Sequence, residues 1–278
     1  KRVWPLCVFI KINGGTCMIT AASNSRIKRL VQLNQKSKLR RTEDVFLAEG
    51  VKMFLEAPRE QLQEVYVSES FLEKCSCREH LEEVGYEVVS DSVFSKISDT
   101  CTPQGVLCVL KQFHYNIEEM LRDKAPLFLL LENIQDPGNL GTMLRTGEGA
   151  GVSGIIMSRD TVDLYNPKVI RSTMGSIYRV PFYYADDFAA AVHQVQRAGV
   201  SVYAAHLRGK NSYACQDYTK ETAFLIGNEG NGLREETAEL ADCYIRIPME
   251  GKVESLNAAV ASSILMYEAH RQRATIEK

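Results

Sequence analysis

From residue 126 onward, short apolar runs alternate with longer segments of mixed polarity. The predicted strands are 126–133, 154–158, 179–184, 200–206, 223–227 and 243–248. Several of these runs are continuously apolar, which is typical of parallel strands covered on both faces. The predicted helices are 140–150, 167–175, 186–198, 232–241 and 255–272. This alternation predicts an α/β fold with a mostly parallel sheet and helices on both faces.

Residues 18–113 have a different rhythm and form a smaller predicted α/β domain. Asn24 and Ser25 are candidate helix caps, and the apolar spacing of Ile27, Leu30 and Val31 favours a helix after them. Further predicted elements are strands at 44–50, 63–70, 86–90 and 105–113 and a helix at 51–58. The polar segment 114–125 is interpreted as a linker to the second domain, 126–278, with a helix as one option for its conformation.

Composition agrees with two soluble globular domains and narrows the kinds of partner. The chain has 278 residues, of which 45% are hydrophobic and 24% charged, as in ordinary soluble proteins. Its net charge of −2 excludes a global polycation, so any nucleic-acid site must be a local patch.

The amino-terminal segment 1–17 is left out of these domains. Its apolar run is broken by Pro5 and has no small-residue cleavage site, so it does not resemble a signal peptide. Met18 looks like a more natural start, and we interpret 1–17 as a leader, a cloning remnant or a misplaced start. Because no run approaches roughly 20 apolar residues, we predict no membrane association.

The eight cysteines are not spaced as a disulfide framework. Cys75 and Cys77 are too close for a simple staple, and no C-x-x-C pair occurs. We interpret them as reduced thiols of a cytoplasmic protein and predict no metal site.

Three loops rich in Gly and Asn carry the candidate chemistry. Residues 133–141, 227–232 and 248–257 each follow a predicted strand and lead into a helix. In open α/β sheets the carboxyl ends of the strands form the ligand-binding edge. One such loop could simply be a turn, but three on one edge favour a shared site.

The composition of these loops does not suit a nucleotide phosphate. No P-loop occurs, and the spacing of Gly149, Gly151 and Gly154 follows a helix instead of a strand, so it indicates a helix end and turn. The loop 227–232 has no cation and contains Glu229. A neutral or cationic ligand fits it better than ATP or NAD, which argues against a nucleotide-dependent Rossmann enzyme.

The same loops resemble the three motifs of the SpoU (TrmH-like) RNA 2′-O-ribose methyltransferases of the SPOUT superfamily. The matching segments are NIQDPGNLGTMLRTGEGAG (133–151), NPKVIRSTMGS (166–176), LIGNEGNGL (225–233) and IPMEGKVESLNAAVA (247–261). The first domain resembles the L30e-like substrate-binding domain of many ribosomal-RNA members. The segments that carry this second resemblance are ASNSRIKRLVQL (22–33), RRTEDVFLAEGVKMFLEA (40–57) and GVLCVL (105–110).

The resemblance implies a fold, a cofactor and an assembly. It implies a trefoil knot near the carboxyl terminus and a homodimer formed with the help of the last helix. A plain amphipathic core helix using Leu256, Val260 and Ile264 is the alternative for that helix. The implied cofactor is S-adenosyl-L-methionine. The residues that it would contact are Ala205, Gly227, Asn228, Ile247 and Leu256.

The resemblance also implies roles around the reacting ribose. Arg145 would lie beside the sugar, where we favour electrostatic stabilisation over a base role because arginine stays protonated. The alternative is a surface ion pair with Glu148. Asn139, Ser255 and Asn257 would orient the reactants. Glu229 is left as either a ligand contact or a partner for an arginine.

RNA contact is predicted for basic residues, mostly in segment 26–41. The predicted RNA-binding residues are Arg26, Lys28, Arg29, Lys38, Arg40, Arg41 and Arg171. The alternative for segment 26–41 is a solvated helix face. The function predicted from the resemblance is methylation of a ribose 2′-hydroxyl in ribosomal RNA of the 23S type. Transfer RNA is the alternative substrate, and a non-catalytic RNA-binding ribosome-assembly protein is the alternative class.

Overall fold

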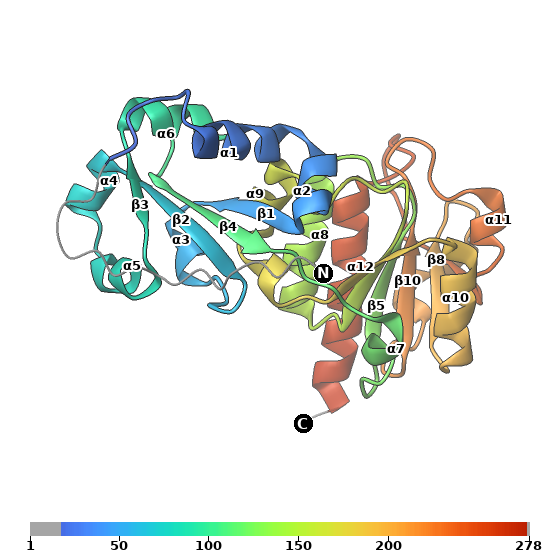
Figure 1. Cartoon of the computed structure of the whole chain (residues 1–278). Helices are drawn as coiled ribbons and strands as arrows, with labels where there is room; N and C mark the ends of the chain where they lie inside the picture. Colours follow the sequence, from blue (N-terminus) through green and yellow to red (C-terminus); the bar gives the residue numbers. More distant parts are fainter. Residues whose placement is uncertain (1–17, 277–278) are drawn as a thin grey trace, which may run out of the picture. The chain divides into compact units, whose positions relative to one another are not determined.

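A computed structural model describes residues 18–276 (Figure 1), so segment 1–17 lies outside the described residues. The chain divides into two compact units between Gln112 and Phe113. This boundary falls one residue before the predicted end of the first domain.

The first unit is built on a four-stranded sheet of order β1-β4-β2-β3. Its strands are β1 (Val45–Glu49), β2 (Leu62–Ser68), β3 (Glu87–Val89) and β4 (Val106–Lys111). Its helices are α1 (Ser25–Gln35), α2 (Ser37–Glu43), α3 (Val51–Leu55), α4 (Glu69–Lys74), α5 (Arg78–Val84) and α6 (Asp91–Ile97). Strand β4 is antiparallel to β1 and β2, while β3 is parallel to β2. The four predicted strands and the predicted helices near 25 and 51 are confirmed.

The second unit holds a seven-stranded sheet of order β7-β6-β5-β10-β8-β11-β9, with every pair parallel. Its strands are β5 (Leu127–Leu131), β6 (Gly154–Ser158), β7 (Phe182–Ala185), β8 (Ser201–Ala205), β9 (Asn211–Ser212), β10 (Thr222–Ile226) and β11 (Cys243–Arg246). Its helices are α7 (Ile117–Met120), α8 (Pro137–Ala150), α9 (Pro167–Thr173), α10 (Phe188–Arg197), α11 (Glu235–Ala238) and α12 (Ala258–Ile276). The short 3-10 helices are η1 (Ser176–Tyr178) and η2 (Tyr213–Cys215). The predicted parallel α/β architecture is confirmed.

Helices cover both faces of this sheet, as Figure 1 shows for α10 and α12 on either side of β8 and β10. Phe128, Leu130 and Leu225 pack with Val192 and Val195 of α10 in one core cluster. The alternate residues of the same strands point to the opposite face, where α12 contacts β10 and α8. Burial on both faces explains why these strands are continuously apolar.

The predicted linker 114–125 is part of the second unit's core. Helix α7 forms within it, and Ile117 and Met120 are buried in the cluster with α10. Half-buried Tyr115 and Leu121 pack against the same cluster, so apolar side chains on and beside this short helix hold it against the core. The segment is therefore packed structure instead of a free connection.

The small residues of α12 mark its buried face. Ala258, Ala259, Ser262 and Ala269 are buried, whereas Val260 is 47% exposed. The amphipathic alternative that placed Val260 in the core is therefore wrong. At its other end, Arg273 donates to the carbonyl oxygens of Ala125, Pro126, Tyr218 and Lys220, which ties the helix to the amino edge of the sheet. The trefoil knot stays a prediction.

Candidate functional site

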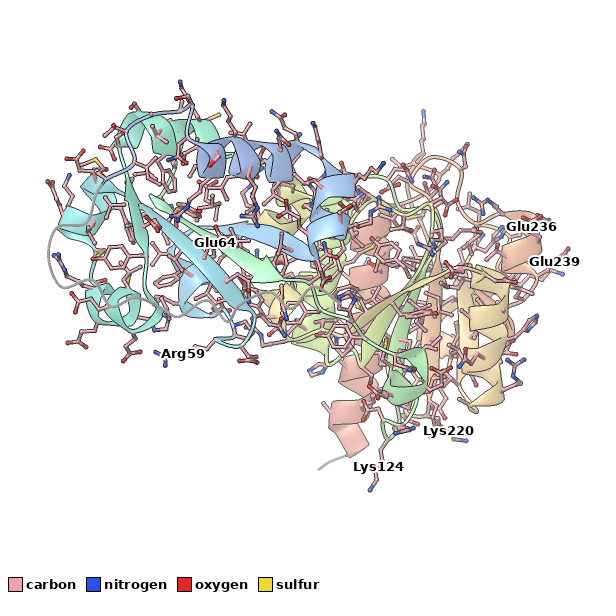
Figure 2. All side chains as sticks on the ribbon, viewed as in Figure 1. Arg59, Glu64, Lys124, Lys220, Glu236 and Glu239 are labelled. Atoms are coloured by element: carbon pink, nitrogen blue, oxygen red, sulfur yellow. The ribbon has the colours of Figure 1, made fainter. Side chains whose placement is uncertain are left out.

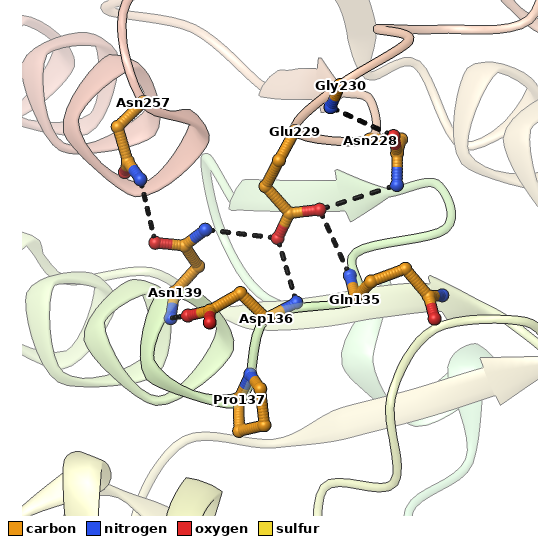
Figure 3. A pocket seen from close by; sticks show the side chains of 8 residues that line it. All are labelled: Gln135, Asp136, Pro137, Asn139, Asn228, Glu229, Gly230 and Asn257. Carbon is orange, nitrogen blue, oxygen red and sulfur yellow. Dashed lines mark hydrogen bonds between the residues drawn. The ribbon is translucent and has the colours of Figure 1, made fainter.

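The three predicted loops meet at the carboxyl edge of the second unit's sheet, joined by a chain of hydrogen bonds (Figure 3). Asn257 Nδ2 donates to Asn139 Oδ1 at 3.0 Å, and Asn139 Nδ2 donates to Glu229 Oε1 at 3.0 Å. The Glu229 carboxylate also accepts from the backbone N–H groups of Gln135 at 3.1 Å and Asp136 at 3.0 Å. Segments more than 90 residues apart in the chain thus form one site.

A pocket of about 700 Å³ opens over this chain of contacts. It is lined by Gln135, Asp136, Pro137, Asn139, Asn228, Glu229, Gly230 and Asn257. This volume suits a ligand of nucleoside size. The lining has carboxamides and carboxylates but no cation, so the pocket itself is suited to hydroxyl and amide groups and not to phosphate.

Two helices begin at the site because their capping residues lie there. The Asp136 side chain accepts from the backbone N–H of Asn139 at 2.7 Å, and Pro137 occupies the first turn of α8, as expected for a stable helix start. The Asn257 side chain caps α12 by accepting from Ala259 N at 2.9 Å. Helix α12 therefore begins at Ala258, three residues later than predicted.

The loop after β10 is a tight turn that only glycine allows at its start. Asn228 and Gly232 exchange backbone hydrogen bonds of 3.0 and 2.9 Å. A Cβ on Gly227 would lie 2.2 Å from the backbone of Gly232. The absence of a side chain on Gly227 therefore lets the loop fold back on itself and presents Glu229 to the first loop.

Glu229 is held as a carboxylate by the surrounding N–H groups. Partial burial opposes its ionisation, but hydrogen bonds from Asn139 and from the backbone of Asp136 and Gln135 outweigh this effect and lower its pKa below the ordinary value. No arginine pairs with Glu229 in the described part of the chain. The arginine-partner alternative is therefore wrong, and the carboxylate joins the first two loops.

Arg145 lies exposed on α8 and does not line the pocket. The alternative ion pair with Glu148 is also wrong, because Glu148 pairs with Arg179 and accepts from Ser176 Oγ at 2.5 Å. Within residues 18–276, no carboxylate engages the Arg145 guanidinium. Ser255 is exposed and likewise stands outside the pocket wall.

The predicted cofactor-contacting residues gather at neighbouring strand ends. Ala205 ends β8, Gly227 follows β10 and Ile247 follows β11, and these strands are parallel neighbours. Half-buried Leu256 lies just before α12. The segment 248–256 runs from the end of β11 to the start of α12, and across the described residues its main chain makes no hydrogen bond. Its backbone groups are thus available to a ligand.

Asn228 stands apart from the rest of this predicted set. Its side-chain amide donates to the Asn133 carbonyl at 2.8 Å and its Oδ1 accepts from Gly230 N at 3.0 Å. The side chain therefore supports the loops, and it lines the pocket.

The predicted RNA-contacting residues of the first unit divide into two groups. Arg40 is only 3% exposed and donates to the carbonyl oxygens of Leu33 and Asn34 at 2.6 and 3.2 Å, so it cannot contact phosphate and is removed from the set. Arg29 binds Glu43 at 2.7 Å and Glu64, labelled in Figure 2, at 2.9 Å. These two arginines serve the fold of the unit.

The remaining basic residues of the predicted set are at the surface. Arg26 is exposed but paired with Glu87 at 2.5 Å. Lys28, Lys38 and Arg41 are exposed on α1 and α2. In the second unit, Arg171 is exposed on α9. Phosphate contact by these residues stays a prediction.

Sequence reasoning missed a second set of contacts beneath the loops. Glu132, the residue after β5, is 1% exposed and binds Arg234 and Thr237. Arg234 also pairs with Asp160. The contact between Glu132 and Arg234 was not predictable, because neither residue belongs to a local sequence pattern that indicates its partner.

Other classes of site have no support in the described residues. No group of three or more His, Cys, Asp or Glu side chains is placed to hold a metal ion among them, and none of their helices could span a membrane. The six cysteines within the described range are free thiols.

Comparison with known families agrees with this architecture. Residues 126–267 match the SpoU rRNA Methylase family, and residues 24–108 match the MRM3-like substrate binding domain. The chain belongs to the SpoU rRNA methylase family, and the predicted enzyme class, an RNA 2′-O-ribose methyltransferase, is confirmed.

Individual relatives match over nearly the whole chain. One is the 23S rRNA (guanosine(2553)-2′-O)-methyltransferase RlmP of Bacillus subtilis, 32% identical over 90% of this chain and 97% of the relative. Among solved structures, an AdoMet-bound rRNA methyltransferase from Sinorhizobium meliloti has 31% identity and a TM-score of 0.79, covering 92% of this chain and 97% of that one. AviRb from Streptomyces viridochromogenes, in complex with AdoMet, has 26% identity and a TM-score of 0.82, covering 91% and 99%.

Proposed function

We propose that this protein transfers a methyl group from S-adenosyl-L-methionine to a ribose 2′-hydroxyl of ribosomal RNA. The observation that carries the proposal is the hydrogen-bonded junction of Asn257, Asn139 and Glu229 beside the ends of β8, β10 and β11. It is supported by the named 23S rRNA methyltransferases among the relatives and by the match of the first unit to a substrate-binding domain.

The residues at the strand ends fit the cofactor. The segment after Ile247, up to Leu256, makes no main-chain hydrogen bond among the described residues, so it can supply N–H and C=O groups for an adenosine and an amino-acid moiety. The strand ends at Ala205 and Gly227 lie at the same edge of the sheet. These groups can bind the cofactor without a cation, which suits a ligand that carries a positive sulfonium. When bound, the cofactor supplies an electrophilic methyl carbon.

The chain's own residues prepare the hydroxyl. The bound cofactor would supply the methyl group, and the hydroxyl has to lose its proton, to solvent, as it accepts that group. Asn139 and Asn257 are held with their amides fixed, so they can orient the ribose and the cofactor without reorganising. Ser255 is proposed to join them from the segment before α12.

Arg145 is proposed to stabilise the oxyanion that develops on the ribose and to hold the adjacent phosphate. Its guanidinium is exposed and unpaired among the described residues, so it is available to an incoming RNA. A fixed positive charge near a developing alkoxide accelerates the reaction electrostatically, and arginine's fork suits a phosphate group.

A homodimer is proposed from the exposed face of α12. Val260 and Tyr267 are 47% and 49% exposed, and their spacing of seven places them on one side of the helix. Half-buried Ile264 lies between them. An apolar stripe of this kind suits contact with a second copy. Sedimentation should show a dimer, and replacing Val260 and Tyr267 by Asp should yield monomers. A cytoplasmic location is expected for an enzyme that acts on RNA, and it stays a prediction.

The test is methyl transfer from radiolabelled S-adenosyl-L-methionine to unmodified ribosomal RNA and, in parallel, to transfer RNA. We expect label only in ribosomal RNA, mapped to a ribose 2′-oxygen. Arg145→Ala should lower the rate roughly 100-fold or more without lowering the melting temperature, since the side chain makes no hydrogen bond or ion pair among the described residues. Label in transfer RNA alone would contradict the substrate, and RNA binding without any methyl transfer would favour the assembly-protein alternative.

A further inference from the structure

We propose that Arg234 is a positioning residue for methyl transfer, which it supports by locking the loop after β5 under the pocket. The inference rests on the proposed function and assigns a role to an arginine that does not line the pocket. It is carried by a closed circuit of contacts between the loops after β5, β6 and β10.

The first part of the circuit is a buried carboxylate. Glu132 directly follows β5 and is 1% exposed. Its Oε2 accepts from the Arg234 backbone N–H at 2.8 Å, and its Oε1 accepts from Thr237 Oγ1 at 2.5 Å and lies 3.5 Å from Arg234 Nη1. A buried carboxylate needs this full set of partners, since removing one leaves a charge uncompensated.

The second part of the circuit joins Arg234 to the loop after β6. The Arg234 guanidinium pairs with Asp160 through Nη2. The backbone carbonyl of Asp160 accepts from Gln135 Nε2 at 2.5 Å. Ser158 Oγ donates to Asp160 Oδ1 at 2.5 Å and accepts from Asn133 N at 2.8 Å. Arg234 therefore holds residues 133–135 indirectly from two directions.

The loop held in this way is the one that forms the site. Asn133 has a φ of 54°, a left-handed conformation that a non-glycine residue adopts at some cost. The backbone N–H of Gln135 then donates to Glu229, which binds Asn139 in turn. Two residues of the loop after β10 thus bind the loop after β5: Arg234 binds at its start, through Glu132, and Glu229 binds at its end, through the backbone N–H groups of Gln135 and Asp136.

A guanidinium is the group that this arrangement requires. Arg234 presents separate nitrogen atoms to Glu132 and Asp160, and its rigid fork can satisfy both carboxylates at once. A lysine ammonium is a single point of charge on a flexible stem, so it would engage them less well. Loss of the fork should let the loop shift, and small displacements in an active site are costly to the rate.

The experiment compares Arg234→Met and Arg234→Lys with Arg159→Met in the full-length protein. Arg159 is the matched control, because it is an exposed arginine next to Ser158 whose ion-pair partner, Asp186, lies outside the circuit. The first readout is the single-turnover rate of RNA methylation per S-adenosyl-L-methionine-binding site, which corrects for any misfolded fraction. We expect a roughly 10- to 100-fold loss for Arg234→Met, partial recovery for Arg234→Lys and an unchanged rate for Arg159→Met.

A second readout does not depend on activity. Hydrogen exchange of the backbone N–H groups of Gln135 and Asp136 should accelerate in Arg234→Met and in Asp160→Asn, and the double variant should add little to either. Unchanged exchange at these positions, or a normal rate per binding site despite faster exchange, would overturn the inference. If the wild-type protein is inactive on every RNA but exchange at Gln135 and Asp136 is still faster in Arg234→Met, the result counts against the proposed substrate. The structural role of Arg234 would then still hold.

Discussion

Asn139 shows how a single side chain can fix the geometry of a site. Its Oδ1 accepts from Asn257 and its Nδ2 donates to Glu229, so the two ends of one amide bind two different loops. Because Glu229 is held as an acceptor, the amide can take only one orientation here. The order of donors and acceptors from Asn257 to Glu229 is therefore determined, and a change at any member should affect the others.

This order of donors and acceptors predicts the effect of replacing the donor of Asn139 by an acceptor. Asn139→Asp would place a second carboxylate against Glu229, and like charges at this distance repel. We expect the methylation rate to fall at least about tenfold. Adding Glu229→Gln should recover part of the loss, since a glutamine amide can donate to the carboxylate introduced at position 139. Kinetics of the two single variants and the double variant measure this, and a double variant slower than both singles would refute the arrangement.

The pKa of Glu229 predicts how stability depends on pH. Its hydrogen bonds lower the pKa of the folded state below the ordinary 4.5, so the carboxylate contributes stability above that pH. This contribution is lost as pH falls through the folded-state value, because protonation then weakens the bonds from Asn139 and the backbone. Melting temperatures from pH 7 down to pH 3 should fall more steeply for the wild type than for Glu229→Gln. Parallel curves would contradict the role of the ionised group.

At the level of elements, the packing of α8 depends on the absence of side chains at specific positions. A Cβ at Gly141 would lie 2.4 Å from Ser172 Cβ and 2.8 Å from the Val169 carbonyl of α9, whereas at Gly147 the nearest contact is an ordinary 3.4 Å. Gly141→Ala should therefore destabilise the protein by roughly 1–3 kcal/mol. Gly147→Ala should be neutral or stabilise by up to about 1 kcal/mol, as alanine favours helices. Denaturant unfolding of both variants checks this, and equal effects would exclude close packing as the cause.

The elements that the sequence predicted are those with a strong apolar signal. Strand β6 was predicted with its observed bounds. All five of its residues are buried, and a strand buried on both faces has a continuous apolar run in its sequence. Strand β9 was missed because it has two residues, too few to show a period. Helix α7 has four residues, so the sequence indicated only that the linker could be helical and not where the helix lies. The start of α12 was placed too early because the sequence does not reveal which of Ser255 and Asn257 supplies the cap.

The candidate site was predictable only as far as its motifs extend. The loops with Asn139, Glu229 and Asn257 were found because Gly- and Asn-rich segments follow three of the predicted strands. Their pairwise contacts were not, since hydrogen bonds between residues 90 or 118 positions apart leave no local pattern. The same limit explains Arg40, which is one of several arginines in a basic segment until the fold turns it inward.

At the scale of the whole molecule, the chain combines two units with separate cores. Buried Leu30, Leu33 and Phe94 belong to one cluster of the first unit, and Phe128, Leu130 and their neighbours belong to a cluster of the second. All of the predicted catalytic and cofactor residues lie in the second unit, while most of the predicted RNA-binding residues lie in the first. This division suggests that methyl-donor binding and substrate selection can be separated.

A fragment of residues 113–278 tests this separation. Since α7 packs into the second unit's core, the cut should fall before residue 113, and a fragment from residue 126 should be less stable. We expect the 113–278 fragment to bind S-adenosyl-L-methionine within about threefold of the full-length affinity, because roughly 0.7 kcal/mol is all that distant residues should contribute. Its methylation of ribosomal RNA should nevertheless fall far more than its affinity for the methyl donor. Calorimetry and the methylation assay measure the two quantities on one preparation. A fragment that methylates ribosomal RNA at the full-length rate would show that the first unit does not select the substrate.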